Sequence, residues 1–502
     1  MKIASIQKVN TPTEMMPVYD LETESGKYTI VAGDTAIEVS NSKRVSLLDV
    51  NALISHGAVH NLREAGSVRG QKNDDYLLQY MSGYSPTQVK VPLVYEKFVN
   101  TLKAAGIDMR RRGPKINLMA MTDKQAQELI GDRYLKNGET ADLRAGELDP
   151  IAGGLFDPKL TQGHNGTVWA GIKLTERMPN PVMEEPIRRL LGLTKKKFEG
   201  IIAGEEKLGE HTGVKAIETA LANIDVDTEM AKARSVINSG RKSHRDDAVR
   251  KLRYLKTLKK TDQKPTDWIM SSVPVLPAAY RPIGFLGDTT TPIVSDPNYM
   301  YQELFLANDL LNQKKKLFGD ESTGSARLNL YNAYKATVGL ADPIHPKLQQ
   351  KNVKGLLASV FGNSPKMGMV QRKLISSAVD NVGRSVVVPD PEMDMDSIGL
   401  PIDMAFTTFK RAVTKSLRQK GMSALEAKKN IEEQTPLARE ILLQAMETTP
   451  VITVRAPAWH KFSTLSFFAK PVAGSAIHVS PLTVRGTLWI LMAYQAKYVT
   501  FR

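Results

Sequence analysis

An asparagine followed by a serine, at Asn41 and Ser42, has the groups needed to rearrange peptide bonds. The side-chain amide nitrogen of Asn41 can attack the carbonyl carbon of the same residue, which forms a succinimide and cleaves the Asn41–Ser42 bond. The Ser42 hydroxyl can act as the nucleophile that accepts an upstream polypeptide by transesterification. The pair therefore predicts a peptide-splicing reaction. The alternative interpretation is an ordinary N-terminal β-hairpin that ends in a common dipeptide.

The elements that would position this pair are short β-strands in residues 1–41. Apolar and polar side chains alternate in Val18-Tyr19-Asp20-Leu21 and in Tyr28-Thr29-Ile30-Val31, and glycines separate the runs. In length and motif order this block resembles the C-terminal fragment of a split intein. Ser40 stands where many inteins carry histidine before the terminal asparagine, and the preceding motif also lacks its usual histidine. The resemblance therefore implies slow or partner-assisted cleavage, with the N-terminal intein fragment on another polypeptide.

Composition narrows the class of protein. At 502 residues the chain is long enough for three or more domains of roughly 150 residues. It has no cysteine, which excludes disulfides and thiolate zinc sites but not carboxylate magnesium sites. No apolar run reaches the roughly 18 residues of a membrane-spanning helix, and the first residues lack the apolar stretch of a secretory signal. We expect a cytoplasmic location, in a bacterial or phage-infected cell or in a virion.

The charge balance indicates a polyanionic partner. Lys and Arg number 68 against 53 Asp and Glu, for a net charge of +15. Neutralising phosphates releases counterions, so nucleic acid is one expected partner and mere solubility is the other explanation. The basic residues are clustered, which favours a nucleic-acid or docking surface over a uniform coat. The clusters are Arg110–Arg112, Lys195–Lys197, Arg241–Lys260 and Lys314–Lys316.

A second set of residues with possible chemistry lies near the C-terminus. The run from Val454 to Phe462, which contains Arg455-Ala456-Pro457, and the run Ala476–Leu482 resemble the β′ subunit of multisubunit RNA polymerases just before its catalytic aspartates. The resemblance implies that Arg455 hydrogen-bonds the nucleotide ribose or the nascent RNA end, that Pro457 belongs to the turn facing the nucleotide, and that His460 braces the loop.

The metal-binding motif of that family is missing. After the Pro-Leu pair the family continues Asn-Ala-Asp-Phe-Asp-Gly-Asp, whose carboxylates hold catalytic Mg²⁺, whereas this chain has no Asp after Asp403 and no Glu after Glu447. Phosphoryl transfer needs that magnesium. The chain is therefore expected to be an RNA polymerase subunit (a nucleotidyltransferase component) that is inactive alone. A frameshift and a gene break, with the aspartates on a remaining β′ polypeptide, are both open explanations.

Other motifs follow the order of the same family. Residues 51–64 resemble the end of the β subunit, and 113–122 resembles a linker where β and β′ are fused. Residues 147–158 resemble a β′ N-terminal signature, and only a short turn replaces the zinc ribbon that follows in the family, so no zinc is expected. The run Lys264–Pro277 resembles the path into the β′ lid, where prolines fix an irregular course. His56 and His60 lie four residues apart, but packing or solvent exposure is favoured over metal binding.

Two further segments have expected roles in the resemblance. Ser295-Asp296-Pro297 predicts a helix start, and two apolar stripes predict a helical hairpin that matches the clamp helices to which a promoter-specificity factor binds. The second stripe contains Leu328, Tyr331 and Val338, and the first contains Leu304, Ala307, Leu310, Leu311 and Leu317. Local packing is the alternative role. Residues 354–384 resemble the switch region, which implies that Arg384, supported by Arg372 and Lys373, contacts template phosphates.

The fold expected from these observations is α+β and multidomain: a small all-β intein fragment, then β/β′-type clamp and active-centre regions with a helical hairpin. The alternative function is a non-catalytic, basic nucleic-acid-binding or scaffold protein derived from a polymerase subunit. Expected partners are DNA, RNA, the upstream intein and β fragment, the aspartate-bearing β′ polypeptide and a promoter-specificity factor, with no membrane. The expected segments are 1–41 (intein fragment), 42–112 (β-like tail), 113–292 (β′ clamp and lid), 293–340 (clamp helices), 341–400 (rudder and switch), 401–486 (start of the active-centre domain) and 487–502 (aberrant tail).

Overall fold

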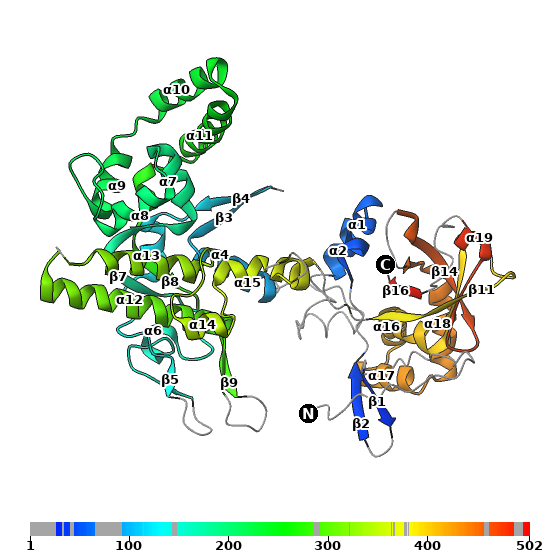
Figure 1. Cartoon of the computed structure of the whole chain (residues 1–502). Helices are drawn as coiled ribbons and strands as arrows, with labels where there is room; N and C mark the ends of the chain where they lie inside the picture. The colour runs from blue at the N-terminus through cyan, green and yellow to red at the C-terminus, as the bar shows by residue number, and fades with distance from the viewer. Residues whose placement is uncertain are drawn as a thin grey trace. The chain divides into compact units, whose positions relative to one another are not determined.

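The computed structural model describes residues 27–32, 35–40, 45–65, 93–113, 115–142, 148–285, 292–320, 322–362, 364, 367–375, 379, 381–455, 461–485 and 495–501. The chain divides into two compact units (Figure 1). We call Val94–Gln371 the helical unit, and Met1–Leu93 together with Arg372–Arg502 the barrel unit. The barrel unit therefore combines an N-terminal and a C-terminal part of the sequence. No helix in the described ranges is both long and apolar enough to cross a membrane.

The helical unit surrounds a long antiparallel pair of strands. The strands of this unit are β3 (Ile107–Arg112), β4 (Lys115–Ala120), β5 (Ala141–Asp142), β6 (Asp149–Pro150), β7 (Ala170–Pro179), β8 (Ile269–Val275), β9 (Ile283–Phe285) and β10 (Pro292–Val294). The strand β7 pairs with β8, and the register shifts between Lys173 and Met178. Ile172, Met270 and Val273 from this pair are buried in the main core of the unit.

Helices pack around that pair. They are α4 (Leu93–Ala104), α5 (Asp123–Ile130), α6 (Pro158–Thr161), α7 (Glu184–Leu191), α8 (Lys195–Ala203), α9 (Gly213–Ala222), α10 (Val226–Ser239), α11 (Lys242–Thr261), α12 (Asp296–Phe318), α13 (Gly324–Val338), α14 (Pro346–Gln350) and α15 (Leu356–Phe361), with short turns η2 (Pro181–Met183), η3 (Pro265–Trp268) and η4 (Ala278–Tyr280). The π-helical turn η5 (Val370–Ile375) spans the boundary between the units. A break separates two of these helices, because α10 ends at Ser239 and α11 begins at Lys242.

The expected helical hairpin is confirmed, as α12 and α13 (Figure 1). Leu304 and Tyr331 are fully buried in it, but Leu310 and Leu317, which we expected on the packed stripe, are 42% and 74% exposed. The buried face of α12 is therefore narrower than the stripe expected from apolar spacing. Ser295 is the N-cap residue of α12, yet its hydroxyl donates to the Pro282 carbonyl at 2.7 Å instead of capping the helix.

One expectation about an irregular segment was wrong. The run Lys264–Pro277 was expected to follow an irregular course, but it contains β8, in which Pro274 keeps its ladder position opposite Gly171 of β7. The expected linker at 113–122 includes β4, which pairs with β3 across a turn at Gly113, and its role as a linker stays a prediction. Within the expected tail 487–502, Gln495–Phe501 forms the strand β16.

The barrel unit contains a closed six-stranded barrel. Its strands are β11 (Val382–Pro389), β12 (Ser397–Pro401), β13 (Val451–Arg455), β14 (Thr464–Val472), β15 (Ile477–Val479) and β16 (Gln495–Phe501), in the order β11-β15-β12-β14-β13-β16. The pairs β11–β15 and β12–β14 are parallel, and the other four pairs are antiparallel. Closure leaves no unpaired sheet edge. The inward residues Val387, Ile398, Val451, Phe467 and Ile477 form the core of this unit.

The helices of the barrel unit cover and extend the barrel. They are α1 (Leu47–Ser55), α2 (Val59–Glu64), α16 (Ile402–Gln419), α17 (Ala424–Glu432), α18 (Pro436–Thr448) and α19 (Pro481–Arg485), with a short turn η6 (Lys461–Ser463). Phe406 and Phe409 of α16 are buried in the barrel core. The expected strands before Asn41 are confirmed for β1 (Lys27–Ala32) and β2 (Thr35–Ser40), an antiparallel hairpin; the expected strand near Val18 lies outside the described residues.

Candidate functional site

The strand β13 places Arg455 at one end of the barrel. Because side chains alternate along a strand, Val451, Thr453 and Arg455 share one face. Val451 belongs to the barrel core, and both Thr453 and Arg455 line a cavity of about 50 Å³. The other residues that line this cavity are Val387, Ile398, Phe462, Ser463, Leu465, Phe467, Val479 and Thr483. Arg455 therefore faces the interior end of the barrel.

This cavity is too small to hold a nucleotide, since small-molecule sites usually enclose roughly 300–1,000 Å³. Its lining is mostly apolar, with Thr453, Ser463 and Thr483 as the hydroxyl-bearing residues. Arg455 is half-buried, and its side chain forms no hydrogen bond or ion pair with another residue of the described ranges. Its planar guanidinium could therefore donate to phosphate or ribose oxygens presented at this end of the barrel.

Arg384 lies in the same barrel but on the other face of its strand. It is in β11, three residues before Val387, and an odd separation puts two side chains on opposite faces of a regular strand. Val387 is buried inside the barrel and lines the cavity, whereas Arg384 is half-buried and does not line it. The strands that carry Arg384 and Arg455 both pair with β16. The structure thus places the two arginines on strands that flank β16, without directing them into one cavity.

The remaining site residues predicted from sequence lie either on η5 or outside the described residues. Arg372 and Lys373 are exposed on η5, ten and nine residues before Val382, where β11 begins. Asn41, Ser42 and Pro457 lie outside the described residues, as does His460.

Close packing explains two glycines of the barrel motifs. A Cβ on Gly383 would lie 2.3 Å from the Met404 Cγ, and a Cβ on Gly399 would lie 2.7 Å from the His478 Cβ. Glycine lets β11 approach α16 and lets β12 approach β15. The neighbouring His478 bonds through Nδ1 to an Asp390 carboxylate oxygen at 3.0 Å, and this hydrogen bond lowers the pKa of Asp390.

The residues present do not fit a catalytic magnesium ion. In the described ranges no group of three or more His, Cys, Asp or Glu side chains is arranged to hold a metal. The whole sequence also lacks an aspartate after Asp403. No metal-dependent step is therefore assigned to side chains of the described ranges.

Sequence reasoning missed that the N-terminal helix α1 supports this end of the barrel. Ala52 is 5% exposed and packs on Val454, the residue before Arg455. The His56 Nε2 lies 2.6 Å from the Lys461 carbonyl oxygen, in the turn that follows the Arg-Ala-Pro segment. This contact agrees with the packing role favoured for His56. The only sequence signal was the order of motifs, since 405 residues separate the two partners.

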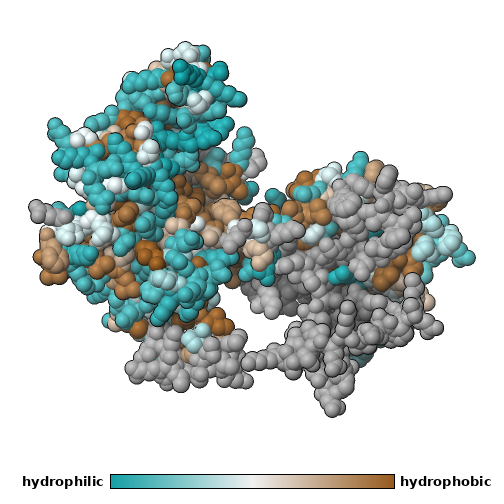
Figure 2. Space-filling model, in the orientation of Figure 1, coloured by the Kyte–Doolittle hydropathy of each residue, from teal (hydrophilic) through white to brown (hydrophobic). Residues whose placement is uncertain are grey.

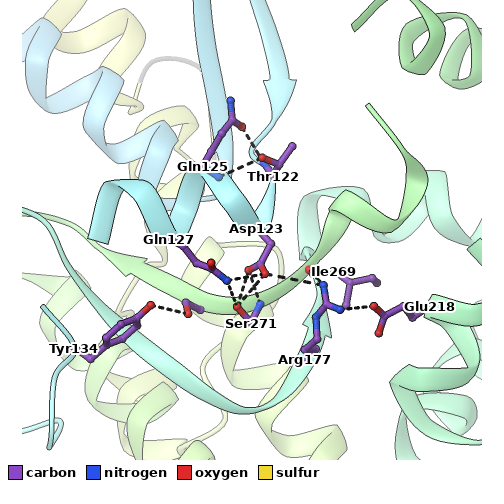
Figure 3. Close-up of polar contacts among 10 residues, drawn as sticks. Thr122, Asp123, Gln125, Gln127, Tyr134, Arg177, Glu218, Ile269 and Ser271 are labelled. Atoms are coloured by element: carbon purple, nitrogen blue, oxygen red, sulfur yellow. Dashed lines mark hydrogen bonds and ion pairs between the residues drawn. The ribbon is translucent and has the colours of Figure 1, made fainter. Parts of the chain in front are cut away.

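A polar network in the helical unit has an evident structural role (Figure 3). The Asp123 carboxylate at the start of α5 accepts hydrogen bonds from the backbone N–H and the hydroxyl of Ser271 in β8, at 2.7 and 2.9 Å. Gln127 donates to the same hydroxyl at 2.8 Å. Arg177 of β7 pairs with Glu218 of α9 and donates to the Ile269 carbonyl at 3.2 Å. These contacts fix α5 and α9 on the β7–β8 pair.

Comparison with known proteins supplies the family relationship. A family model described as RNA polymerase Rpb1, domain 2, matches residues 376–445. The DNA-directed RNA polymerase subunit β′ of Mycoplasmopsis pulmonis (strain UAB CTIP) is 29% identical over 289 residues, which cover 54% of this chain and 20% of that protein. The subunit β′ of Emiliania huxleyi is 30% identical over 275 residues, covering 54% and 44%. The subunit β′ of Nocardioides sp. (strain ATCC BAA-499 / JS614) is 26% identical over 323 residues, covering 62% and 23%.

The matches thus span from about a fifth to less than half of the length of these relatives. The segment matched by the family model comprises β11, β12, α16, α17 and most of α18, which build much of the barrel unit around Arg384. The chain therefore contains a region of the DNA-directed RNA polymerase β′ type.

Proposed function

We propose that this chain forms part of the nucleic-acid cleft of a DNA-dependent RNA polymerase, as a fused β-tail and β′ N-terminal subunit. In this proposal Arg455 contacts the incoming nucleotide or the RNA end, with Pro457 shaping its turn. Arg384, Arg372 and Lys373 contact the template strand. DNA and RNA are the bound polymers, and Mg²⁺ is held by aspartates of a second polypeptide.

The observation that carries the proposal is the packing of α1 on the barrel. The β-like segment containing Ala52 packs on Val454, directly beside Arg455 of the β′-like segment. Val45 also packs with Val379 and Val382, at the start of β11. Two segments that resemble different polymerase subunits thus form one hydrophobic contact next to the expected nucleotide-side arginine, as a shared cleft requires.

The proposal is tested by reconstitution. The full chain is mixed with an upstream β fragment and a polypeptide that carries the Asn-Ala-Asp-Phe-Asp-Gly-Asp motif, with Mg²⁺, a primed DNA–RNA scaffold and labelled nucleotides. We expect template-dependent RNA extension that requires all components. Arg455→Ala should lower the extension rate by about 10²-fold or more, since one lost transition-state donor costs on that order. The matched control is Arg439→Ala, an arginine of α18 outside the proposed cleft.

The same experiment distinguishes the polymerase subunit from the alternative, a non-catalytic scaffold protein. Nucleic-acid binding without extension in any combination of subunits would favour the non-catalytic scaffold protein. Equal extension rates for Arg455→Ala and Arg439→Ala would exclude the proposed role of Arg455.

We further propose that residues 1–41 act as the C-terminal half of a split intein. The support is the Asn41-Ser42 pair and the β1–β2 hairpin that ends at Ser40. Mixing the chain with a candidate N-terminal intein fragment should release a product that lacks residues 1–41, detected by intact mass. Asn41→Ala should block release, whereas Asn51→Ala, on the exposed face of α1, should not.

The hairpin of α12 and α13 is the proposed docking site of a promoter-specificity factor. Leu317 and Phe318 are 74% and 62% exposed near the end of α12, and Leu306 is 64% exposed on the same helix. Leu306→Asp should abolish promoter-specific initiation in the reconstituted enzyme while leaving extension on a primed scaffold unchanged.

A further inference from the structure

The helix α11 presents two chemically different sets of cations. It packs against α10 and forms a helical hairpin with it (Figure 1), and its Leu255 and Leu258 are buried in the unit core. On the side facing α10, Lys251 pairs with Glu229 at 2.7 Å, and Lys259 pairs with Asp227 at 2.5 Å. Hydrogen bonds from Lys232 and then Lys251 lower the pKa of Glu229, so this carboxylate stays charged. These lysines hold the two helices together.

The second set of cations has no such partner. We call Lys242, Arg245, Arg253, Lys256 and Lys260 the basic stripe. All five side chains are exposed, and none forms an ion pair with a residue in the described ranges. At 100° per residue they fall within about 80° of arc, on one face of the helix. At 1.5 Å per residue the stripe is about 27 Å long.

The other basic clusters of the sequence are more neutralised. Lys315 pairs with Glu176 and Asp320, Lys195 with Glu199, and Arg110 with Asp108. Among the residues that the structure describes, the basic stripe aligns five cations without an ion pair on one face of a single helix. Hydrophilic residues dominate the surface of the α10–α11 hairpin at the top of Figure 2.

We propose that the basic stripe binds the phosphate backbone of double-stranded nucleic acid, independently of sequence. Its length corresponds to on the order of eight base pairs at 3.4 Å per pair. Proteins that hold single strands stack bases on aromatic side chains, and the helix face of the stripe has none; the one apolar residue between its members on that face is Val249. It also lacks the Asn and Gln side chains that read base edges. Asp246 borders the stripe on one edge and Arg250 extends the positive charge beside it.

The test measures binding of the full chain to a labelled 30-base-pair DNA duplex by fluorescence anisotropy between 50 and 300 mM KCl. Each neutralised phosphate contributes about −0.9 to the slope of log K against log salt. The double variant Arg253→Glu with Lys256→Glu should therefore lower the steepness of that slope by about two and weaken binding at 100 mM KCl by at least tenfold. Five full contacts would give a slope of about −4.5 for the stripe.

The matched control is Lys428→Glu with Lys429→Glu, two exposed lysines of α17 in the barrel unit that change the net charge equally. We expect it to bind like the wild type. Equal weakening of both variants, or of neither, would overturn the assignment to α11. Two more measurements test the identity of the partner. Tighter binding of single-stranded than of duplex DNA would overturn the preference for duplex. Competition by polyglutamate as strong as competition by unlabelled duplex would overturn nucleic acid as the partner.

The assay is separate from the polymerase proposal because it needs no nucleotides, magnesium or second polypeptide. Reconstituted extension could fail while duplex binding succeeds, and the reverse is also possible. All four substituted side chains are exposed, so circular dichroism melting of each variant should match the wild type and exclude unfolding as the cause.

Discussion

Replacing the buried Arg281 should destabilise the helical unit more than any exposed arginine does. Its side chain is 0% exposed. Its Nε donates to the Leu276 carbonyl at 2.6 Å, its Nη1 to the Asn298 Oδ1 at 2.8 Å and its Nη2 to the Leu155 carbonyl at 2.5 Å. The guanidinium carbon also lies 4.7 Å from the centre of the Phe156 ring. One side chain thus joins the end of β8, the start of α12 and the segment before α6.

The expected magnitude follows from two opposing effects in Arg281→Met. Burial lowers the pKa of Arg281 to about 10, which corresponds to on the order of 3 kcal/mol of charge desolvation that methionine would relieve. Methionine would also remove three hydrogen bonds from a charged donor, at roughly 1.5–3 kcal/mol each. The losses exceed the gain, so we expect a net loss of about 4 kcal/mol in the free energy of unfolding.

The measurement is thermal unfolding of the full chain by circular dichroism, with hydrogen exchange to locate the weakened segment. A loss of that size should lower the melting temperature of the helical unit by about 8–16 °C. Arg281→Lys keeps the charge but not the planar fork that reaches three acceptors, so it should lose at least as much. The control Arg253→Met, on exposed α11, should stay within about 0.5 kcal/mol of the wild type.

A change below about 1 kcal/mol for Arg281→Met would refute this reasoning, because the three carbonyl and amide acceptors would then have found other donors. Full stability of Arg281→Lys would refute the narrower claim that the shape of the guanidinium, and not its charge alone, is required.

Three further predictions concern packing and charge. A hydrogen bond from His478 lowers the pKa of Asp390 from its ordinary value of 3.8. The Asp390 carboxylate therefore stabilises the barrel at pH values above 3.8, and this stabilisation is lost as the pH falls through the lowered pKa. Asp390→Asn should make the stability of the barrel against unfolding depend less on pH below about pH 4. Leu304→Ala, at a fully buried site, should cost about 2–5 kcal/mol in urea unfolding, whereas Leu317→Ala at a 74% exposed site should cost less than about 0.5. Ala52→Glu should detach α1 from the barrel, seen as faster tryptic cleavage near that helix, with the circular dichroism of the barrel unchanged.

The sequence predicted well those elements whose signals are local. The hairpin of α12 and α13 was expected from apolar spacing and from the helix start at Ser295-Asp296-Pro297. The strands β1 and β2 were expected from the alternation of apolar and polar side chains. Prolines misled the prediction at β8, because each one removes a single backbone donor and leaves the rest of the strand free to pair.

Pairing between strands far apart in the sequence could not be predicted from local patterns. The parallel pairs β11–β15 and β12–β14 join segments about 70 to 90 residues apart, and nothing local encodes their register. Register decides which face each side chain takes, so Arg384 and Arg455 could be identified as candidates from their motifs while their directions could not. The strand β16 was missed because its sequence matched no expected motif.

The packing of Val45, just before α1, connects the two proposed activities of the chain. Splicing at the Asn41–Ser42 bond would join an upstream polypeptide to Ser42, three residues before Val45, which is 7% exposed and packed against Val379 and Val382. The new peptide bond would thus precede Val45 by three residues in the sequence, and Val45 itself packs at the start of β11, the strand of Arg384. Splicing at this position would join the upstream fragment to the chain and, in the same step, complete the wall of the proposed cleft. Before splicing, the intein fragment is joined to Ser42 in place of the upstream polypeptide. The precursor should therefore extend RNA more slowly than the spliced product in the reconstituted system.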